Sequence, residues 1–360
     1  MKIAIVIWRM AFSGAENVAN ALIQEFISSG HEVEVILTAS KVEASTDFKV
    51  HSVAIDGPQG IRQIKRSILL RKIVKENNYD VVIGFGHIDA IHVLRALPFV
   101  NTTTIACARM DPLTYPENKR LRIERKLMYR MVDGMILQTN SQKEYFKKIV
   151  KGPTVVIPNP VRDFGIKSVC VAERENKCVT VARLDDAQKD HMFMFECFRE
   201  FVKIHPDYIL ELYGDGPDKQ KYENYINQHG LEGKIVLCGR VNNPQEHIKN
   251  AKMFLLTSRH EGMPNALIEA MAMGLPCVAV DCGGGGVKDL VRNNENGIIV
   301  EQGDLQTFVY EMCRVADDNV LQERLSAGAI QIRAELSLKA IAHRWIEAFK
   351  KIRKGKIDYD

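Results

Sequence analysis

Apolar, β-branched runs alternate with segments of helical period from one end of this 360-residue chain to the other. Lys2–Ile7 fits a strand, Gly14–Ser29 a helix and His31–Leu37 a strand, and the same alternation continues to residue 157. Strands that are separated by helices lie parallel, in a sheet that has helices on both faces. The sequence therefore predicts an α/β fold built on doubly wound parallel sheets.

The alternation breaks near the middle of the chain and then restarts. Pro158-Asn159-Pro160 interrupts the pattern, residues 161–175 form a connector, and Cys178–Val181 begins a second series. A chain of this length is too long for one ordinary hydrophobic core. We therefore expect two domains, residues 1–162 and residues 163–337. Ligands of doubly wound domains lie at the carboxyl ends of the strands, so we expect the site in a cleft between the two domains.

The composition is that of a folded globular protein, with 46% hydrophobic and 26% charged residues. Uninterrupted apolar runs stay below ~18 residues, so no membrane-spanning helix is expected, and the first ten residues fit a secretory signal poorly. The eight cysteines form neither a Cys-x-x-Cys pair nor a cluster at zinc spacing. We therefore expect buried thiols, no metal site and a reducing, cytoplasmic location.

Positive charge is concentrated in the first half of the chain. Residues 1–165 hold 23 lysines and arginines against 16 acidic residues, whereas the remainder holds 26 against 29. Much of the excess lies in two predicted helices, Ile61–Lys75 and Glu117–Val132, where apolar residues such as Ile64 and Ile68 stand among the basic ones. Two interpretations stay open: a solvated outer face of a core-packed helix, or a peripheral contact with anionic lipid at the inner face of a membrane. Nucleic acid is not expected as a partner, because no aromatic stacking pattern accompanies the charges.

The densest polar motif is H-E-G-M-P-N-A-L-I-E, residues 260–269, directly after a predicted strand. Gly262 permits a tight turn, and Pro264 suits the first turn of a helix. The unpaired amides from Asn265 onward and the helix dipole favour an anion such as a diphosphate. Glu269 lies in the second turn, where its carboxylate leans back towards the helix start and can accept hydrogen bonds from sugar hydroxyls.

This motif resembles the signature of family-4 retaining glycosyltransferases, in which two glutamates are separated by seven residues. Five other segments resemble further parts of the family pattern: Ser13-Gly14-Ala15-Glu16, Ile157-Pro158-Asn159-Pro160, Val181-Ala182-Arg183-Leu184 followed by Lys189, Tyr213-Gly214-Asp215-Gly216-Pro217, and Gly239-Arg240-Val241. The resemblance covers most of the chain and extends to members that make bacterial surface polysaccharides. It implies the GT-B fold, with an acceptor-side domain at 1–162, a donor domain at 163–337, and a last helix at 338–351 that crosses back to the first domain.

The resemblance also implies a role for each motif residue. Arg183 and Lys189 would neutralise the donor diphosphate and, with Glu261, are the expected catalytic residues, because charge builds on the diphosphate as the sugar leaves. Glu269 would hold the ribose hydroxyls, and Glu261 hydroxyls of the transferred sugar. The remaining donor-binding residues that the motifs imply are Gly14, Gly214, Arg240, Val241, Gly262, Met263, Pro264, Asn265 and Ala266.

On the acceptor side, many family members carry a histidine near the reacting carbon, where this chain has Cys107-Ala108-Arg109-Met110-Asp111-Pro112. Arg109, Asp111 and His87 are the acceptor-side candidates. Family members need no metal ion, and the sequence has no Asp-x-Asp doublet; Asp185-Asp186 is interpreted as solvated.

The predicted function is transfer of a hexosyl or N-acetylhexosaminyl group, with retention and without a cofactor, from a UDP-linked nucleotide sugar to a lipid-linked bacterial surface glycan. Two alternatives differ in class. One is a sugar-nucleotide epimerase or phosphorylase of the same fold, and the other is a non-catalytic sugar-nucleotide-binding partner in a glycosylation complex. The glutamate spacing beside Arg183 favours the transferase over the first, and the intact donor motifs favour it over the second.

Overall fold

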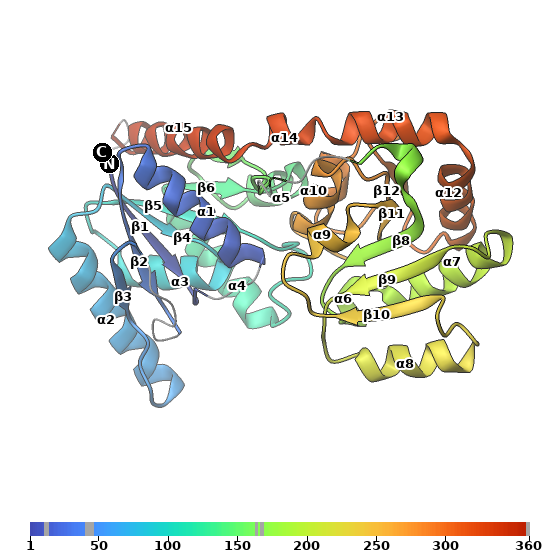
Figure 1. Cartoon of the computed structure of the whole chain (residues 1–360). Coiled ribbons are helices and arrows are strands. Elements are labelled where there is room, and N and C mark those ends of the chain that lie inside the picture. The colour runs from blue at the N-terminus through green and yellow to red at the C-terminus, as the bar shows by residue number, and fades with distance from the viewer. Residues whose placement is uncertain (11–13, 40–46, 163–164, 166–168, 358–360) are drawn as a thin grey trace. The chain divides into compact units, whose positions relative to one another are not determined.

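The computed structural model describes residues 1–10, 14–39, 47–162, 165 and 169–357. The chain forms two compact units (Figure 1). The first unit comprises Met1–Pro160 and Leu338–Asp360, and the second comprises Val161–Ser337. The sequence pattern places this division two residues later, after residue 162.

The first unit is built on a parallel sheet with the strand order β3-β2-β1-β4-β5-β6-β7, seven strands within the described part of the chain. Its strands are β1 (Lys2–Ile7), β2 (Glu32–Leu37), β3 (Val50–Ser52), β4 (Val81–Gly84), β5 (Thr103–Ala108), β6 (Gly134–Leu137) and β7 (Thr154–Val156). The inner strands are continuous buried runs, as expected for a sheet that is covered on both faces. The edge strand β3 is not predicted from the sequence, because three residues carry too short a pattern.

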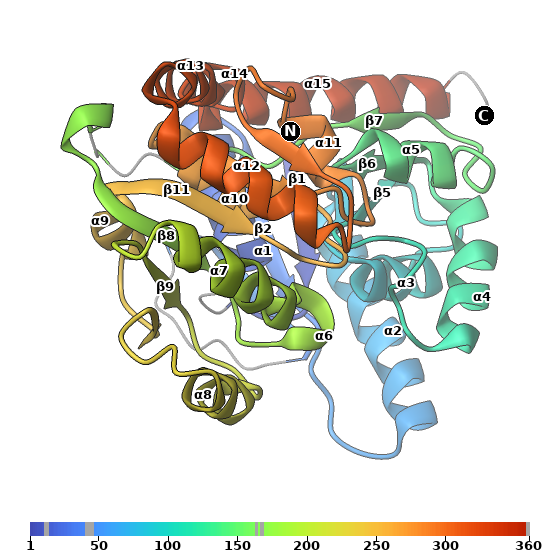
Figure 2. The same cartoon turned by 90° about the vertical axis from the view of Figure 1, so that its right-hand side faces the viewer.

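The helices of this unit lie on both faces of the sheet. They are α1 (Gly14–Ser28), α2 (Gln59–Asn77), α3 (His87–Ala96), α4 (Lys119–Met128), α5 (Asn140–Phe146) and α15 (Leu338–Ile357), with a 3₁₀ turn η1 (Tyr129–Met131). Helices α2, α3 and α4 lie side by side, with α3 in the middle (Figures 1 and 2). The helix predicted over Glu117–Val132 is shorter. It begins after Asn118, whose side chain accepts a hydrogen bond from the amide of Arg120 and so caps it, and it ends at Met128, where η1 follows.

Helix α15 joins the first unit through large apolar side chains. The ring of buried Trp345 lies 6.0 Å from that of Phe85 and 6.4 Å from that of Phe26, on α1. Gly134 of β6 leaves room for Ile352, because a Cβ at residue 134 would lie 2.7 Å from that side chain. The helix extends to Ile357, beyond the predicted end at residue 351.

The second unit is built on a parallel sheet with the order β10-β9-β8-β11-β12-β13, six strands within the described residues. Its strands are β8 (Glu175–Val181), β9 (Ile209–Tyr213), β10 (Ile235–Gly239), β11 (Ala251–Leu256), β12 (Cys277–Val280) and β13 (Ile298–Val300). Helix α7 contributes Phe195, Phe198 and Phe201 to the main core cluster of this unit. Both sheets confirm the predicted α/β, doubly wound fold.

The helices of the second unit that the structure describes lie between its strands, except that η2 precedes the first strand and three helices come after the last. They are η2 (Val171–Glu173), α6 (Asp186–Lys189), α7 (His191–Ile204), α8 (Lys219–Gln228), α9 (Pro244–Ile248), α10 (Asn265–Ala272), α11 (Gly286–Leu290), α12 (Leu305–Asp317), α13 (Asn319–Ala329) and α14 (Ile332–Glu335). Pro264 is the residue before α10 rather than its first helical residue, with ψ at 98°. Among the described residues, every helix is too short or too polar to cross a membrane.

Candidate functional site

The motif residues of the second unit gather at one edge of its sheet. Strands β9, β8 and β11 are neighbours, and they end at Tyr213, Val181 and Leu256. Because parallel strands present their carboxyl ends at the same edge, the loops that follow them lie together. These loops carry Gly214, Arg183 and Glu261.

Lys189 and Glu261 are in direct contact although they are 72 residues apart in the chain. The Nζ atom of Lys189 donates to Oε1 of Glu261 at 2.5 Å, and the Ser258 hydroxyl donates to the same oxygen at 2.8 Å. The two charged side chains are 17% and 9% exposed, so the pair is largely shielded from water. Coulombic attraction is stronger in such a shielded place than at a free surface.

Hydrogen bonds to the backbone hold the segment that carries Lys189 against the loop that carries Glu261. The Thr257 hydroxyl donates to the carbonyl oxygens of Lys189 and Asp190, at 3.0 and 3.1 Å. The amide of Arg259 donates to the carbonyl of Gln188. The residue after α6, Asp190, has φ 52°, which ends that short helix and turns the chain into α7. The contact between Lys189 and Glu261 is therefore built into the backbone arrangement.

The glycine run 283–286 packs directly under the turn that carries Glu261. The Glu261 amide donates to the carbonyl of Gly283, and the Gly283 amide donates to that of Arg259. A Cβ on Gly286 would lie 2.2 Å from the carbonyl oxygen of Gly262 and 2.8 Å from Pro264. Only glycine permits this approach, so the run fixes the position of the loop before α10.

Helix α10 begins at this turn. Met263 and Gly262 are buried, whereas Asn265 and Ala266 are half-buried, so the first turn of α10 borders the surface. The amides of Leu267 and Ile268 donate to the carbonyl of Pro264. The start of this helix carries the positive end of its dipole.

Glu269 has a partner that the sequence analysis does not identify. Its Oε2 atom accepts a hydrogen bond from Nε2 of Gln245, at 2.7 Å, and Gln245 is 5% exposed. Burial raises the pKa of Glu269 above the usual value, and the Gln245 hydrogen bond and the Arg162 charge oppose that shift. The one sequence signal for Gln245 is Pro244, which starts α9 and so places the next residue at a helix N-terminus.

Arg183 is an exposed cation at this edge. Its side chain is 67% exposed, and its guanidinium lies 3.9 Å from the Asp185 carboxylate. The interpretation of Asp185-Asp186 as solvated is wrong for Asp186, which is buried. It accepts hydrogen bonds from the amide of Met192, six residues further along the chain, and from Lys221 Nζ, which tertiary packing brings near.

The neighbouring loops pack closely behind Arg183. Gly214 has φ 152°, and a Cβ there would lie 1.8 Å from the carbonyl oxygen of Ala182. The Gly214 amide donates to the carbonyl of Gly239, which ends β10. Arg240 and Val241 follow, the first exposed and the second half-buried. Gly214 therefore brings together the loops after β8, β9 and β10.

The site residues predicted in the first unit lie in separate local environments. Gly14 is the first residue of α1, and the preceding residue of its motif, Ser13, lies outside the described residues. His87 begins α3 and is 7% exposed; burial lowers its pKa to about 4, so its imidazole is neutral at pH 7. Its ring meets that of Tyr115 edge to face, at 4.6 Å.

The two other acceptor-side candidates hold local structure. The guanidinium of Arg109 lies 3.9 Å from the centre of the Phe85 ring, and Nη1 donates to Oδ1 of Asn159 at 2.7 Å. The carboxylate of Asp111 accepts from the amide of Leu113 at 3.0 Å and from the Thr114 hydroxyl at 3.3 Å, and so stabilises a turn.

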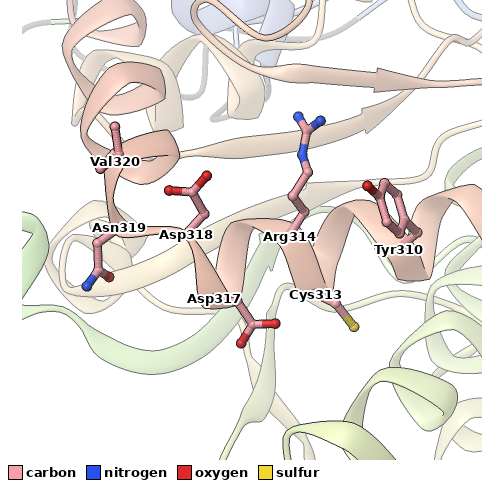
Figure 3. Close-up of a pocket in the computed structure, with 7 residues that line it drawn as sticks. All are labelled: Tyr310, Cys313, Arg314, Asp317, Asp318, Asn319 and Val320. Carbon is pink, nitrogen blue, oxygen red and sulfur yellow. The ribbon is translucent and has the colours of Figure 1, made fainter.

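A separate pocket lies in the second unit (Figure 3). It is lined by Tyr310, Cys313, Arg314, Asp317, Asp318, Asn319 and Val320. Helix α12 runs back from the carboxyl end of β13, so its last residues reach the amino edge of the sheet. The Asp317 carboxylate lies 3.7 Å from Nε2 of His205, which precedes β9, in agreement with this placement. The pocket is therefore on the edge opposite Lys189 and Glu261.

Metal ligands do not gather at these loops. Within the described residues, no three histidine, cysteine, aspartate or glutamate side chains lie close enough together to hold a metal ion.

Comparison with known proteins identifies the class of this chain. The family model described as Glycosyltransferase Family 4 matches residues 12–163, and the model described as Glycosyl transferases group 1 matches residues 175–318. The division between the two matches falls at the connector that separates the two units.

Curated relatives include transferases of bacterial surface glycans. The chain is 26% identical over 370 residues to the GalNAc-alpha-(1->4)-GalNAc-alpha-(1->3)-diNAcBac-PP-undecaprenol alpha-1,4-N-acetyl-D-galactosaminyltransferase of Campylobacter jejuni, covering 98% of this chain and 99% of the relative. It is 28% identical over 289 residues to the UDP-Gal:alpha-D-GlcNAc-diphosphoundecaprenol alpha-1,3-galactosyltransferase of Escherichia coli, covering 72% of each.

Solved structures with the same fold match almost the whole chain. Anabaena HepE in complex with UDP superposes with a TM-score of 0.80 at 16% identity, covering 97% of this chain and 100% of that one. The family models, the relatives and the fold agree. The chain belongs to the family-4, group 1 glycosyltransferases and is a glycosyltransferase of the GT-B type, with relatives in bacterial polysaccharide biosynthesis.

Proposed function

We propose that this glycosyltransferase moves a hexosyl or N-acetylhexosaminyl group from a UDP-linked sugar to a lipid-linked bacterial glycan, with retention of configuration and without a metal ion or other cofactor. The observation that carries the proposal is the contact between Lys189 and Glu261 at the carboxyl edge of the second sheet. It joins a cation suited to a diphosphate and a carboxylate suited to sugar hydroxyls. Each group serves a different half of a nucleotide-sugar donor.

In the reaction, the bond between the anomeric carbon and the donor β-phosphate oxygen breaks. The acceptor hydroxyl oxygen bonds to the same carbon, and its proton leaves with the nucleotide diphosphate. Negative charge grows on the departing diphosphate, where we place Arg183 and Lys189. Preorganised cations are most effective where charge develops during the reaction. Glu261 keeps Lys189 in position and, in this proposal, also accepts from a hydroxyl of the transferred sugar.

No metal ion is needed in this proposal, because side chains and backbone amides of the protein supply the positive charge. Lys189 carries three N–H donors, of which Glu261 takes one, and Arg183 presents an exposed guanidinium. The start of α10 adds backbone amides and the positive end of the helix dipole. We therefore expect full activity in excess chelator. Loss of activity in chelator that manganese or magnesium restores would contradict this part of the proposal.

The choice of donor and acceptor rests on the relatives. The Escherichia coli relative is named for UDP-galactose, and solved structures of the same fold hold UDP. Both named relatives act on diphosphoundecaprenol-linked glycans. Retention is supported by the two glutamates, Glu261 and Glu269, at the spacing of the retaining family.

A two-stage assay tests the proposal. A thermal-shift screen of nucleoside diphosphates should show the largest rise in melting temperature with UDP, because ligands that bind the folded state stabilise it. The best UDP-sugar is then incubated with undecaprenol-diphosphate-linked glycans, and the anomeric configuration of the product is determined by NMR. A retained configuration is expected. Epimerised donor without any acceptor, phosphorolysis, or binding without turnover would instead support one of the alternative functions.

A further inference from the structure

Two helices of the first unit, α2 and α4, expose large apolar side chains. In α2, Ile61, Ile64 and Ile68 are 55%, 64% and 63% exposed. The core side of this helix is formed by other residues, Leu70 and Val74 among them. The spacing of three and four residues places the three isoleucines on one stripe along the outside of the helix.

Helix α4 repeats this arrangement. Ile123 and Leu127 are 61% and 59% exposed, and Met131, in the following 3₁₀ turn, is 53% exposed. Leu113, in the loop before the helix, is 66% exposed. These four and the three isoleucines of α2 make up half of the large apolar side chains that are exposed in the described part of the chain. We call the seven residues the apolar stripes.

The two helices border the same buried helix. Helix α3 lies between α2 and α4, and most of its side chains are buried (Figures 1 and 2). The outer surface on either side of α3 is therefore formed by α2 and α4. Arg95 of α3 and Glu124 of α4 form an ion pair, which ties these two helices together.

The charge beside the apolar stripes is almost all positive. Helix α2 holds six basic residues and one acidic residue, and α4 holds five basic residues and one acidic residue. Both acids are paired, Glu76 with Lys72 and Glu124 with Arg95. With two acidic residues against eleven basic ones, the two helices stay strongly positive.

Two arginines on these helices are buried, so they stabilise the fold and do not contribute to the charge of the surface. Arg66 and Arg125 are 7% and 2% exposed, so the solvated-face interpretation is wrong for them. Arg125 donates to the carbonyl oxygens of Tyr115 and Pro112 and thereby holds the loop before α4. The basic side chains that are exposed are Lys65, Lys72, Lys75, Lys119, Arg120, Lys126 and Arg130.

We infer that the apolar stripes and these exposed basic residues form a docking surface for an anionic lipid bilayer. Exposed isoleucine and leucine insert at the boundary of headgroups and acyl chains, while flanking lysine and arginine attract anionic headgroups. Nucleic acid would use the positive charge but not the aliphatic stripes. A second copy of the chain would bury the stripes but would bring its own positive charge against them. An anionic bilayer matches both features.

The test is co-sedimentation of the full chain with vesicles, without donor or acceptor. Wild type should bind phosphatidylglycerol vesicles and not phosphatidylcholine vesicles. Binding should weaken as salt rises from about 0.05 M to about 0.5 M, because the Debye length shortens. Absence of binding to phosphatidylglycerol at low salt, or equal binding to both vesicle types, would overturn the inference.

Variants separate the two components of the surface. Ile64→Glu with Ile123→Glu should lower the affinity for anionic vesicles by at least about tenfold, through loss of apolar insertion and added repulsion. Lys65→Gln with Lys126→Gln should lower the affinity for anionic vesicles by about fivefold per residue. Ile204→Glu is the matched control, because Ile204 is 63% exposed but lies in the second unit. Unchanged binding in the isoleucine variant, or an equal loss in the control, would overturn the inference.

Two further readouts keep the outcome unambiguous. Thermal melting and UDP binding of each variant should equal those of wild type, since none of these residues lies at the donor loops. Sedimentation velocity should show the same oligomeric state for wild type and the isoleucine variant. A wild-type dimer that this variant dissociates would assign the stripes to a protein interface instead. The inference shares the lipid-linked acceptor with the proposed function, but vesicle binding is measured without substrates, so each fails separately.

Discussion

At the scale of single residues, the contact between Lys189 and Glu261 makes the two side chains interdependent. Lys189→Met and Glu261→Gln should each lower the single-turnover rate about 10- to 150-fold, the loss of ~1.5–3 kcal/mol for a contact to a charged group. The double variant should cost less than the sum, with a coupling of ~0.5 kcal/mol or more. Lys177→Met is the control, because Lys177 pairs with Glu175 at the opposite end of β8. Strictly additive losses would show that the pair does not act as a unit.

Glu269 should act on donor affinity rather than on the chemical step. Ribose changes little during transfer, so Glu269→Gln should weaken donor binding and leave the single-turnover rate at saturating donor nearly unchanged. Gln245→Ala should weaken donor binding in the same way, because Gln245 orients the carboxylate through the 2.7 Å hydrogen bond. Calorimetric titration and rapid quench measure the two quantities. A slowed chemical step with unaltered affinity would reverse the roles of Glu269 and Glu261.

Asp89 gives the first unit a pH dependence of stability. It is 5% exposed, it accepts from the Thr38 hydroxyl at 2.9 Å, and burial raises its pKa from 3.8 to about 7. The nearby Arg66 charge opposes that shift. Because the folded state holds this proton more tightly than the unfolded state, the stability that Asp89 contributes is present below pH 3.8. It is lost as pH rises towards 7.

Urea unfolding of wild type and Asp89→Asn across this range tests that sign. The free energy of unfolding of wild type relative to the variant should fall as pH rises from about 4 to about 7, by at most ~1.4 kcal/mol per pH unit. Above pH 7 the difference should level off. A difference that grows with pH would mean that Asp89 is ionised in the fold at low pH.

For single residues, the sequence predicts the charged residues that belong to a recognisable motif, but it does not predict the side chains that hydrogen-bond to them. Glu261, Glu269 and Arg183 follow strands at recognisable spacing, so their shared edge can be predicted. Gln245 meets Glu269 only through tertiary packing, and Ser258 contacts Glu261 from three residues earlier in the same loop. A lone glutamine or serine carries no pattern. Burial of Arg125 and Asp186 is missed for the same reason, since charged residues are assigned to solvent by default.

At the scale of elements, the start of α10 depends on the glycine turn that precedes α11. Gly286→Ala should destabilise the protein by ~1–3 kcal/mol and weaken donor binding, because a Cβ would meet the carbonyl of Gly262 at 2.2 Å. Gly60→Ala is the contrasting control, since its Cβ would meet nothing within 4 Å and the helical backbone accepts alanine. It should gain ~0.4–1 kcal/mol. Equal melting temperatures for wild type and Gly286→Ala would contradict the tight approach.

The helical period of the sequence predicts that α2 and α4 are helices, but not which of their side chains face the core. Leu70 and Val74 of α2 pack inward, while Ile64 and Ile68 lie outward, because the stripe that meets the sheet is chosen by the neighbouring strands and α3. The apolar content of the outer face therefore emerges only with the tertiary structure.

At the scale of the whole molecule, alternation of strand and helix is enough to predict two parallel sheets. Each inner strand is buried on both faces, so it reads as a continuous apolar run that single-sequence analysis detects. Short edge strands such as β3, and the extension of α15 to Ile357, depend on neighbours rather than on their own pattern. The packing of Trp345 against Phe26 and Phe85 joins segments that lie about 260 residues or more apart in sequence.

The proposed function requires that the carboxyl edge of the second sheet binds the nucleotide diphosphate. Hydrogen–deuterium exchange with and without UDP tests it directly, because bound ligand slows exchange of the amides that it orders. Peptides that cover residues 182–190 and 257–270 should exchange more slowly with UDP, while the peptide over 310–320 at the opposite edge should be unchanged. Protection confined to 310–320, or to the first unit alone, would show that the nucleotide binds elsewhere.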